Sequence, residues 1–523
     1  MKILRQMIKL KNDNLYYFLI VLVALLPVMI FRDFTPSNEL RYLSIADEAI
    51  RNNTFFTFYN HGLAYADKPP LYIWVVMLGK WLFGTHHMWF LSLFSLIPAF
   101  VIIKVMDSWV AGEMSAELRN ASRWMMITCG LFLGLAITLR MDMLMCMFIV
   151  LALRVFYRMK ENQGNARTNA ILFPVYVFLA LFSKGPIGIL VPLLSITVYL
   201  FVVGRIKEFG RYWGWTTWGI LLVCCAVWFG AVYAEGGEAY LNNLLFHQTI
   251  DRAVDAFHHK APFYYYLVSV WYSIAPWSLF AISVIILALV RKKEISDLQK
   301  LFLSVIVTTF VMLSCISSKL QVYLLPAFPF IVYCAALYIP KLQVNAWLKA
   351  MIAVPSAIFI LVLPLMVAAT VFSEELSQYG EPLFYVAAAV LTISGIVTVY
   401  FLYKSENGVL KAVRSLSVGL LLAVFAGGMA LPSINHELGY GELCKKAKSV
   451  AQEHNVKTIS TWGVSRAENI DVYLGQQVNV IDKNDDPSKH VSEGDLLLIR
   501  NRDIDKFGNK ESWTVGKYAI VLL

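Results

Sequence analysis

Long apolar runs alternate with short polar segments along most of the chain. Each run is about 16–22 residues long, which is the length that an α-helix needs to cross the hydrocarbon core of a bilayer. We therefore predict an all-α polytopic membrane protein over residues 1–433. About thirteen transmembrane helices are expected, at residues 14–32, 88–106, 120–138, 141–158, 169–183, 186–203, 214–233, 264–290, 301–316, 321–339, 347–371, 382–403 and 412–431.

The composition agrees with a chain surrounded by membrane lipids. It is 58% hydrophobic and only 15% charged, whereas a soluble domain carries about a quarter of charged residues. The first apolar run follows a basic N-terminus but lacks the small-residue pattern of a cleavage site, so we expect it to be a retained anchor. The seven cysteines have no spacing typical of a metal site and are interpreted as packing residues.

Basic residues are distributed unequally between alternate loops. If the N-terminus is cytoplasmic, the loops on that side hold Lys104, Arg119, Arg123, Arg154, Arg158, Lys160, Arg167, Arg205, Lys207, Arg211, Arg291, Lys292, Lys293, Lys300, Lys341, Lys349, Lys404, Lys411 and Arg414. The later loops on the other side hold single basic residues, namely Arg140, Lys184, Arg252, Lys260 and Lys319. This distribution follows the positive-inside rule. The net charge of +10 therefore indicates topology, and no nucleic-acid partner is expected.

The character of the chain changes after residue 433. Residues 440–454 have a helical pattern, and strand-like runs follow at 458–463, 477–482, 495–500 and 518–523. This pattern predicts a small soluble α/β domain over 434–523, on the outer (periplasmic) side of the membrane. No glycine-rich fingerprint opens a helix in it, so no nucleotide cofactor is expected.

The unusual polar segments all fall on the outer side in this topology. They are the long first loop (33–87), residues 140–142, residues 183–186, the loop 235–262 and residues 317–319. The inner connections, by contrast, read as plain charged turns. We therefore expect a site that opens at the outer face.

The first loop begins with an amphipathic stretch from residue 38 to about residue 51. Its apolar positions fit a helix that lies on the membrane interface. In the simplest interpretation, Glu39 and Arg41 belong to the solvated face of that helix. Asp67 and Lys68 then precede Pro69 and Pro70, which bar a helix through this point and could start the next one. Asp67 is thus either an ordinary helix cap or part of a site.

Other polar positions also leave two interpretations open. Arg140 and Asp142 form either a simple interfacial turn or part of a site. Lys184 either extends to the membrane surface or faces a phosphate. His259, in a loop, is either solvated or joins Asp67 in a partial metal site.

Taken together, these segments resemble bacterial membrane glycosyltransferases of the GT-C type. They are most similar to the lipid A 4-amino-4-deoxy-L-arabinose transferases and the related protein O-mannosyltransferases. The resemblance rests on six islands in order: 38–42 (NELRY), 65–69 (YADKP), 140–142 (RMD), 184–186 (KGP), 259–263 (HKAPF) and 319–326 (KLQVYLLP). It implies the GT-C fold, a bacterial inner-membrane location and a sugar donor carried on a polyprenyl phosphate, whose chain the apolar bundle would hold.

The resemblance also implies roles for individual residues. Cations would stabilise the charge that grows on the leaving phosphate, and the candidates are Lys68, Arg140, Lys184 and Lys319. Asp67 and His259 would hold a divalent metal ion such as Zn, Mg or Mn. The substrate-binding set is completed by Arg41, Tyr65 and Tyr323, and Asp142 would line the donor cavity. Tyr72 and Trp74 are further aromatic candidates for stacking on the sugar.

The chain departs from the family pattern at Asn38, where an acidic residue is expected. An asparagine cannot act as a base. If the acceptor is a hydroxyl group, Glu39 would take over as the base. If the acceptor is a phosphate of lipid A, no base is needed, because that oxygen is already ionised. At Asp67 the chain has Asp where the family has Glu, which shortens that side chain.

The main hypothesis is transfer of a sugar to lipid A or a related envelope glycoconjugate. A second hypothesis is transfer to a protein or glycan hydroxyl from the same class of donor. A third is a transporter or lipid flippase. Transporters tend to show related halves with polar groups near the midplane, and neither feature is visible here.

Overall fold

The computed structural model of the protein describes residues 2–246, 260–377 and 379–523, and this part is mostly helical. The longer helices of the bundle are α1 (Lys2–Phe31), α4 (Met88–Trp109), α5 (Ala116–Ile127), α6 (Gly130–Ile137), α7 (Asp142–Lys160), α8 (Ala166–Lys184), α9 (Ile187–Val202), α11 (Trp215–Asn242), α13 (Tyr265–Ser273), α14 (Ser278–Val290), α15 (Asp297–Cys315), α16 (Phe328–Tyr338), α17 (Ala346–Phe372), α19 (Pro382–Lys404) and α20 (Gly408–Met429). Short helices connect them: η1 (Ile206–Glu208), α10 (Phe209–Tyr212), η3 (Gln321–Ala327), η4 (Ile339–Lys341), α18 (Glu374–Ser377) and η5 (Leu431–Ile434).

Each range expected to cross the membrane coincides with helix in the structure. Within the described residues, however, eight helices are long and apolar enough to span a bilayer, or ten if each of two bent pairs counts as one span. Shorter apolar helices cover Leu15–Phe31, Leu71–Phe83 and Ile187–Val202. The polytopic helical architecture is thus confirmed, and the number thirteen stays a prediction.

Two of the expected spans are broken helices. The axes of α5 and α6 differ by 67°, and those of α13 and α14 differ by 120°. The second break contains Pro276, which cannot supply a helical N–H. The two breaks face each other, because the amide of Gly130 donates to the carbonyl of Ala275 at 2.7 Å. The indole of Trp277 also donates to Thr128 Oγ1 at 2.9 Å.

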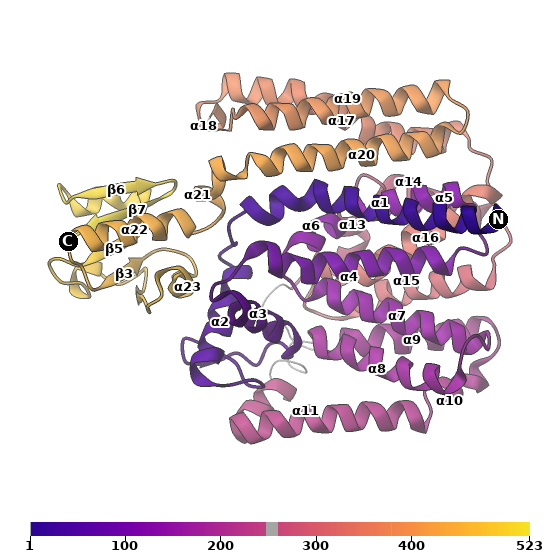
Figure 1. The fold of residues 1–523 in the computed structure, drawn as a ribbon, viewed down its shortest axis with the longest axis horizontal. Helices are drawn as coiled ribbons and strands as arrows, with labels where there is room; N and C mark the ends of the chain where they lie inside the picture. Colours follow the sequence, from indigo (N-terminus) through magenta and orange to yellow (C-terminus); the bar gives the residue numbers. More distant parts are fainter. Residues whose placement is uncertain (1, 247–259, 378) are drawn as a thin grey trace.

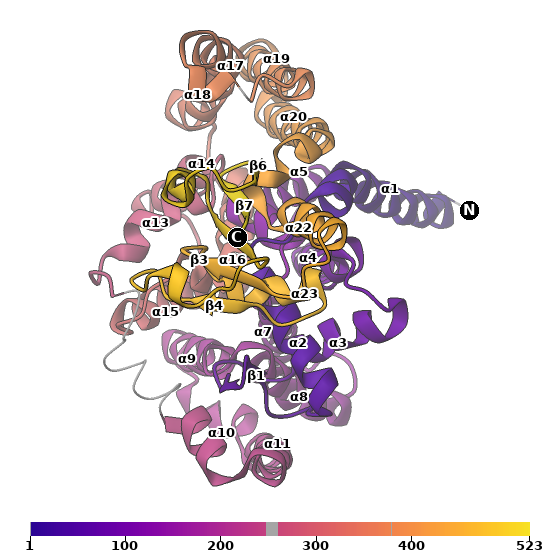
Figure 2. The same cartoon turned by 90° about the vertical axis from the view of Figure 1, so that its left-hand side faces the viewer.

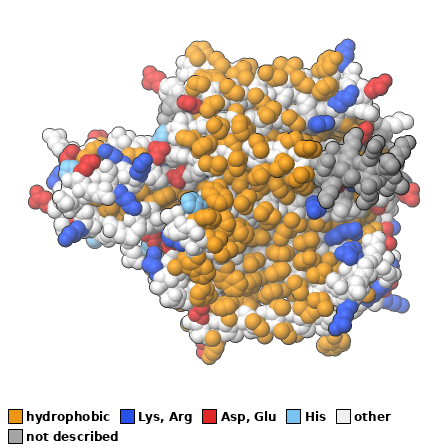
Figure 3. All heavy atoms as spheres, in the orientation of Figure 1, with side chains coloured by type: hydrophobic (Ala, Val, Ile, Leu, Met, Phe, Trp, Pro, Cys, Tyr) orange, Lys and Arg blue, Asp and Glu red, His pale blue; other side chains and the backbone are white. Residues whose placement is uncertain are grey.

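The two ends of the bundle differ in character. Figure 1 shows the first helix starting at the end opposite the C-terminal domain, as an odd number of crossings requires. Figure 3 shows a broad apolar belt between the ends, with blue basic side chains along the edge away from that domain. Seen end-on, the C-terminal domain covers the middle of its end of the bundle (Figure 2).

The first loop folds into a layer between the bundle and the C-terminal domain. It contains α2 (Glu39–Asn52), the two-stranded hairpin of β1 (Tyr59–Asn60) and β2 (Leu63–Ala64), and α3 (Leu71–Phe83). Helix α2 packs against α3 and against two short C-terminal helices, η6 (Ala467–Ile470) and α23 (Asp471–Leu474).

The expectation that α2 has a solvated polar face is wrong. Glu39, Ser44, Asp47 and Glu48 are all buried, and two short helices of the C-terminal domain pack against α2. Each carboxylate has a local partner. Asp47, for example, lies 3.1 Å from Lys80 Nζ and 2.8 Å from His86 Nε2.

The expected loop at 235–262 also begins later than the sequence suggests. Helix α11 continues to Asn242, with non-helical backbone at Gly237. Glu235 reaches the first loop and accepts hydrogen bonds from the amides of Phe55, Phe56 and Thr57. This carboxylate therefore links α11 to the first loop.

The C-terminal domain is a mixed five-stranded sheet with helices packed against it. Helix α22 (Gly441–Glu453) and the four expected strands are confirmed, as β3 (Ile459–Trp462), β4 (Asn479–Ile481), β5 (Leu496–Arg500) and β7 (Tyr518–Leu522). The strand order is β4-β3-β5-β7-β6. Strands β4, β3 and β5 are parallel, and β7 is antiparallel to both β5 and β6. The remaining strand, β6 (Ser512–Val515), was not expected, because it is a short edge strand with half of its residues exposed. A short helix η7 (Pro487–Lys489), a longer η8 (Asn501–Phe507) and α21 (Asn435–Leu438) complete the domain.

Asp33, just after α1, attaches this domain to the bundle. Its carboxylate accepts from the amide of Gly441 at 2.7 Å and from the Tyr473 hydroxyl. Its own amide donates to Asn435 Oδ1 at 3.0 Å, and the Asn435 amide group donates to the carbonyl of Phe31 at 2.7 Å.

We predict that Asp33→Ala loosens this attachment. The substitution leaves the hydroxyl of Tyr473 and the amide of Gly441 without their acceptor, which costs about 1–3 kcal/mol. The measurements are thermal unfolding of the purified protein and the rate of limited proteolysis between residues 431 and 441. Asp505→Ala, at an exposed site in the same domain, serves as the control. Equal cleavage rates and unfolding temperatures for the two variants would contradict the attachment.

Candidate functional site

The centre of the candidate site is the Asp142 carboxylate, which is fully buried. Arg140 Nε lies 3.0 Å from one of its oxygens, and Lys184 Nζ contacts the other. A buried carboxylate is stable only when it is paired and hydrogen-bonded. The two helix termini contribute as well, because Asp142 starts α7 and Lys184 ends α8, where the helix dipoles favour an anion and a cation respectively.

This geometry decides two of the alternatives left open by the sequence. The Lys184 side chain is only 4% exposed, so it does not extend to the membrane surface. Arg140 is partly exposed but pairs with the buried Asp142, so the two are not a simple interfacial turn. Tyr323, on η3, joins them, because Lys184 Nζ lies 4.4 Å from the centre of its ring.

A second cluster comes from the first loop. Lys68 Nζ lies 3.1 Å from a carboxylate oxygen of Asp67, and the hydroxyl of Tyr65 donates to the same oxygen at 3.4 Å. The guanidinium of Arg41 lies 5.6 Å from the centre of the Tyr65 ring. Pro70, with no side-chain hydrogen bond, occupies the cap position of α3, so Asp67 is not the helix cap.

Arg41 is the cation of this cluster that is open to a ligand. Its Nε is buried and has no hydrogen-bond partner among the residues that the structure describes. A buried guanidinium nitrogen without an acceptor is unfavourable. An anionic ligand above the Tyr65 ring would remove this deficit.

The two clusters lie side by side. The hydroxyl of Tyr42, next to Arg41, contacts the sulfur of Met141, between Arg140 and Asp142, at 3.8 Å. Within the described residues, these clusters hold four cations and two carboxylates. The cations are Arg41, Lys68, Arg140 and Lys184, and the carboxylates are Asp67 and Asp142. The excess positive charge suits an anion such as a phosphate.

Glu39 does not have the geometry of a general base. Its two oxygens form a double ion pair with Arg32 at 2.6 Å, and they accept further hydrogen bonds from the amides of Thr35 and Leu139. Burial alone would raise the pKa of this carboxyl. The hydrogen bonds and charge of Arg32 outweigh burial and, with the two amides, hold the pKa below its usual value. Glu39 is thus a structural residue that fixes the start of α2.

Two further predicted residues show no contact with the clusters among the described residues, and a third cannot be placed. Asn38 precedes α2 without a side-chain cap hydrogen bond. Lys319 is buried and donates to the carbonyl of Ile316 in its own loop. His259 lies outside the described residues. The residue after it, Lys260, forms a β-bridge with Ser318, which places the end of the loop beside 317–319.

The expected metal site at Asp67 and His259 lies only partly within the described residues. Asp67 is paired with Lys68, and no group of three or more His, Cys, Asp or Glu side chains occurs in that part of the chain. The metal site at Asp67 and His259 stays a prediction, which chelation followed by addition of Mg²⁺, Mn²⁺ or Zn²⁺ would test. No catalytic step is derived through it.

Two aromatic side chains of the first loop, Tyr72 and Trp74, pack against other rings. Tyr72 is 1% exposed and packs edge-on against Tyr42 at 5.7 Å. Trp74 packs between Phe56 and Phe182, and its indole donates to the carbonyl of Phe55. Tyr72 is therefore too buried to stack on a sugar ring, whereas stacking by Trp74 stays a prediction.

Two residues beside the site were not anticipated. Arg32 follows the first apolar run directly, and a single arginine at that place is normally interpreted as a topology signal. Tyr42 is one of many aromatic residues in the sequence. No sequence pattern linked Arg32 to Glu39 or Tyr42 to residues 140–142.

No protein-family model matches the chain. Among curated proteins, it is 24% identical over 455 residues to the undecaprenyl phosphate-alpha-4-amino-4-deoxy-L-arabinose arabinosyl transferase of Aeromonas hydrophila, covering 82% of this chain and 81% of the relative. It is 22% identical over 479 residues to the corresponding transferase 1 of Pseudomonas fluorescens, covering 86% and 80%.

Solved structures extend the likeness to nearly the whole chain. The crystal structure of ArnT from Cupriavidus metallidurans in the apo state superimposes with a TM-score of 0.75 at 18% identity, covering 98% of both chains. The chain has the ArnT fold. The structure of the same ArnT bound to undecaprenyl phosphate gives a TM-score of 0.74 and covers 97% of both chains. The resemblance to GT-C glycosyltransferases inferred from the six islands is confirmed, and it extends through the later helices and the C-terminal domain of this ArnT-like chain.

We predict that Glu39→Gln affects stability far more than chemistry. The substitution leaves Arg32 without its charge partner and should cost on the order of 3 kcal/mol. Activity per folded molecule should stay within about tenfold of wild type, whereas loss of a general base costs about 10²–10⁴. A loss of activity much larger than tenfold, with unchanged stability, would contradict this prediction and identify Glu39 as the general base.

The pH dependence of that difference gives a second readout. Because the folded-state pKa of Glu39 is lowered, its contribution to stability is fully present above the unfolded-state pKa, about 4.3. The contribution is lost as the pH falls through the folded-state pKa. The difference in unfolding temperature between wild type and Glu39→Gln should therefore be constant near neutral pH and should shrink in acid.

Proposed function

We propose that this protein is an integral membrane glycosyltransferase that moves a sugar from a polyprenyl-phosphate donor to lipid A or a related envelope lipid. The main support is the excess of positive charge around Asp142 in an ArnT-like fold. The relatives are named as transferases of a sugar from undecaprenyl phosphate, and one solved neighbour holds undecaprenyl phosphate. A pentose is the sugar that the names of these relatives favour.

The proposed reaction breaks the bond between the anomeric carbon and the donor phosphate oxygen. The bonding electrons leave with the polyprenyl phosphate, and an acceptor oxygen forms the new bond to the anomeric carbon. Negative charge grows on the departing phosphate, so cations placed in advance lower the barrier. Arg41, Lys68, Arg140 and Lys184 have this role, and Tyr65 and Tyr323 position the donor.

The carboxylates of the site favour an acceptor that needs no base. Within the described residues, Asp142 is held by two cations, Asp67 by Lys68, and Glu39 by Arg32. Each of these carboxylates therefore already has a cation as its partner. A phosphate oxygen is already ionised at neutral pH and attacks without losing a proton. We therefore favour a phosphate of lipid A over a protein or glycan hydroxyl.

The proposal includes a topology. The apolar belt and the charge distribution suit a bacterial inner-membrane protein with a cytoplasmic N-terminus. The first loop, the candidate site and the C-terminal domain would then lie on the periplasmic side. Nucleotide-sugars are not expected there, which is why a lipid-anchored donor is required.

We predict that Lys68→Met and Lys184→Met each reduce transfer by about 10² or more, because each removes a cation that stabilises the leaving phosphate. The measurement is sugar transfer from a polyprenyl-phosphate donor by equal amounts of purified protein. Lys404→Met, at an exposed position at the end of α19, should retain wild-type activity. Full activity in both site variants would overturn the site assignment.

The product identifies the acceptor. Mass spectrometry of envelope lipids from cells with and without the gene should show a sugar added to a lipid A phosphate only in cells that carry it. A sugar added to glycoproteins in place of lipids would support the O-glycosyltransferase alternative.

A further inference from the structure

A cavity lies between the first loop and the C-terminal domain, away from the clusters described above. Its volume is about 300 Å³, at the lower end of the range for small-molecule sites. Its lining residues are Arg51, Asp471, Gly475, Gln476 and Gln477. No apolar side chain lines it, so a ligand would be recognised by charge and hydrogen bonds.

The cavity holds an acceptor that the protein leaves unused. Asp471 is 6% exposed. One carboxylate oxygen accepts from Ser44 Oγ at 3.2 Å and lies 3.7 Å from His61 Nε2. The other, Oδ1, is buried and has no hydrogen-bond partner in the described part of the chain. Burial also raises the pKa of this carboxyl, despite its contacts with His61 and Ser44. A hydroxyl donor from a ligand would satisfy Oδ1.

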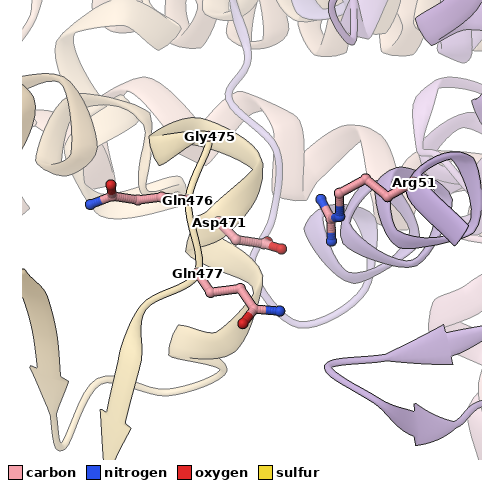
Figure 4. Close-up of a pocket in the computed structure, with 5 residues that line it drawn as sticks. All are labelled: Arg51, Asp471, Gly475, Gln476 and Gln477. Carbon is pink, nitrogen blue, oxygen red and sulfur yellow. The ribbon is translucent and has the colours of Figure 1, made fainter.

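Arg51 faces this carboxylate across the cavity. In Figure 4 the Asp471 carboxylate and the Gln477 amide extend towards the side of Arg51, and the Gln476 amide points away. Among the described residues, the Arg51 guanidinium has no hydrogen bond or ion pair closer than 4.0 Å, and its side chain is exposed. A guanidinium group is a planar fork of donors that matches a phosphate. The Gln477 amide can both donate and accept.

The position of the cavity relates it to the proposed reaction. Arg51 is in the last turn of α2, and Arg41 is in its first turns. Ten residues of helix separate the Cα atoms of Arg41 and Arg51 by about 15 Å along the axis. A large acceptor whose reacting group lies at the candidate site is therefore long enough to place another of its sugars in the cavity.

We propose that this cavity is a binding subsite for a phosphorylated saccharide. The phosphate binds Arg51, a sugar hydroxyl donates to Asp471 Oδ1, and Gln477 contacts a second hydroxyl. The inference deepens the proposed function, since the saccharide would be part of the acceptor glycolipid. A free sugar phosphate has the same chemistry, and the test separates the two sources.

The first experiment measures binding to the full-length protein in lipid nanodiscs. The probes are N-acetylglucosamine 1-phosphate, N-acetylglucosamine and inorganic phosphate. Binding of each probe is measured by saturation-transfer NMR and by calorimetry. The sugar phosphate should bind more tightly than either part, and Arg51→Gln should weaken it by about tenfold or more. Arg51→Lys, which keeps the charge, should retain part of the affinity. Arg502→Gln, at an exposed arginine elsewhere in the C-terminal domain, should bind as wild type does.

The second experiment measures transfer kinetics with the same variants. If the acceptor supplies the saccharide, Arg51→Gln raises the KM for the acceptor and leaves kcat and the KM for the donor unchanged. If Arg51→Gln loses binding of the sugar phosphate but leaves the KM for the acceptor unchanged, the natural ligand of the cavity is a free sugar phosphate. If neither the wild type nor any variant transfers sugar, the proposed function is refuted. The binding of the sugar phosphate to the cavity would still be established by the first experiment.

The proposal is overturned by any of three results. One is no detectable binding of the sugar phosphate. Another is equal binding by wild type and Arg51→Gln. The third is equally tight binding of inorganic phosphate alone. Since Arg51 is exposed, its substitution should not impair folding, and thermal unfolding of each variant confirms this.

Discussion

The candidate site depends on one buried charge, the carboxylate of Asp142. At zero exposure this group requires cations close by, and it has two, Arg140 and Lys184. The two cations come from the turn before α7 and from the end of α8, so satisfying the carboxylate also fixes how these helices meet. One negative charge between two positive charges leaves an excess, and that excess gives the site its preference for anions. The same three side chains, Arg140, Asp142 and Lys184, therefore hold the helices together and give the site its positive charge.

The first loop contributes the second cluster of the site, and its buried charges are neutralised by local partners. Its helix α2 carries several carboxylates, and each is neutralised locally, Glu39 by Arg32 and Asp47 by Lys80 and His86. This neutralisation lets α2 lie buried beneath the C-terminal domain despite its charge. With α2 held in this way, Arg41 is placed over Tyr65 and beside the Asp142 cluster. The acidic groups that look catalytic in the sequence are thus the ones that build the scaffold.

Much of the architecture could be predicted because it follows from short-range patterns. Apolar length identifies the spans, alternation identifies β3, β4, β5 and β7, and Pro70 identifies the start of α3. The failures involve contacts between distant segments. The burial of Glu39 depends on Leu139 and Arg32, and α2 packs against two short helices after residue 466. A local pattern contains no information about such partners. The convergence of residues 140–142, 184 and 323 was anticipated only because the loops were assigned to one face and the six islands resembled a family.

The facing breaks in two helical pairs have a consequence for how the protein is made. The backbone of a broken span has donors and acceptors that hydrocarbon cannot satisfy. Here the amide of Gly130 finds its acceptor at Ala275, which is synthesised much later. The segment 116–137 therefore cannot complete its final hydrogen bonding until 265–290 has been synthesised. Assembly of the bundle is thus a late, long-range event, and a ribosome that stops between these two segments would leave an incompletely packed chain for quality control to remove.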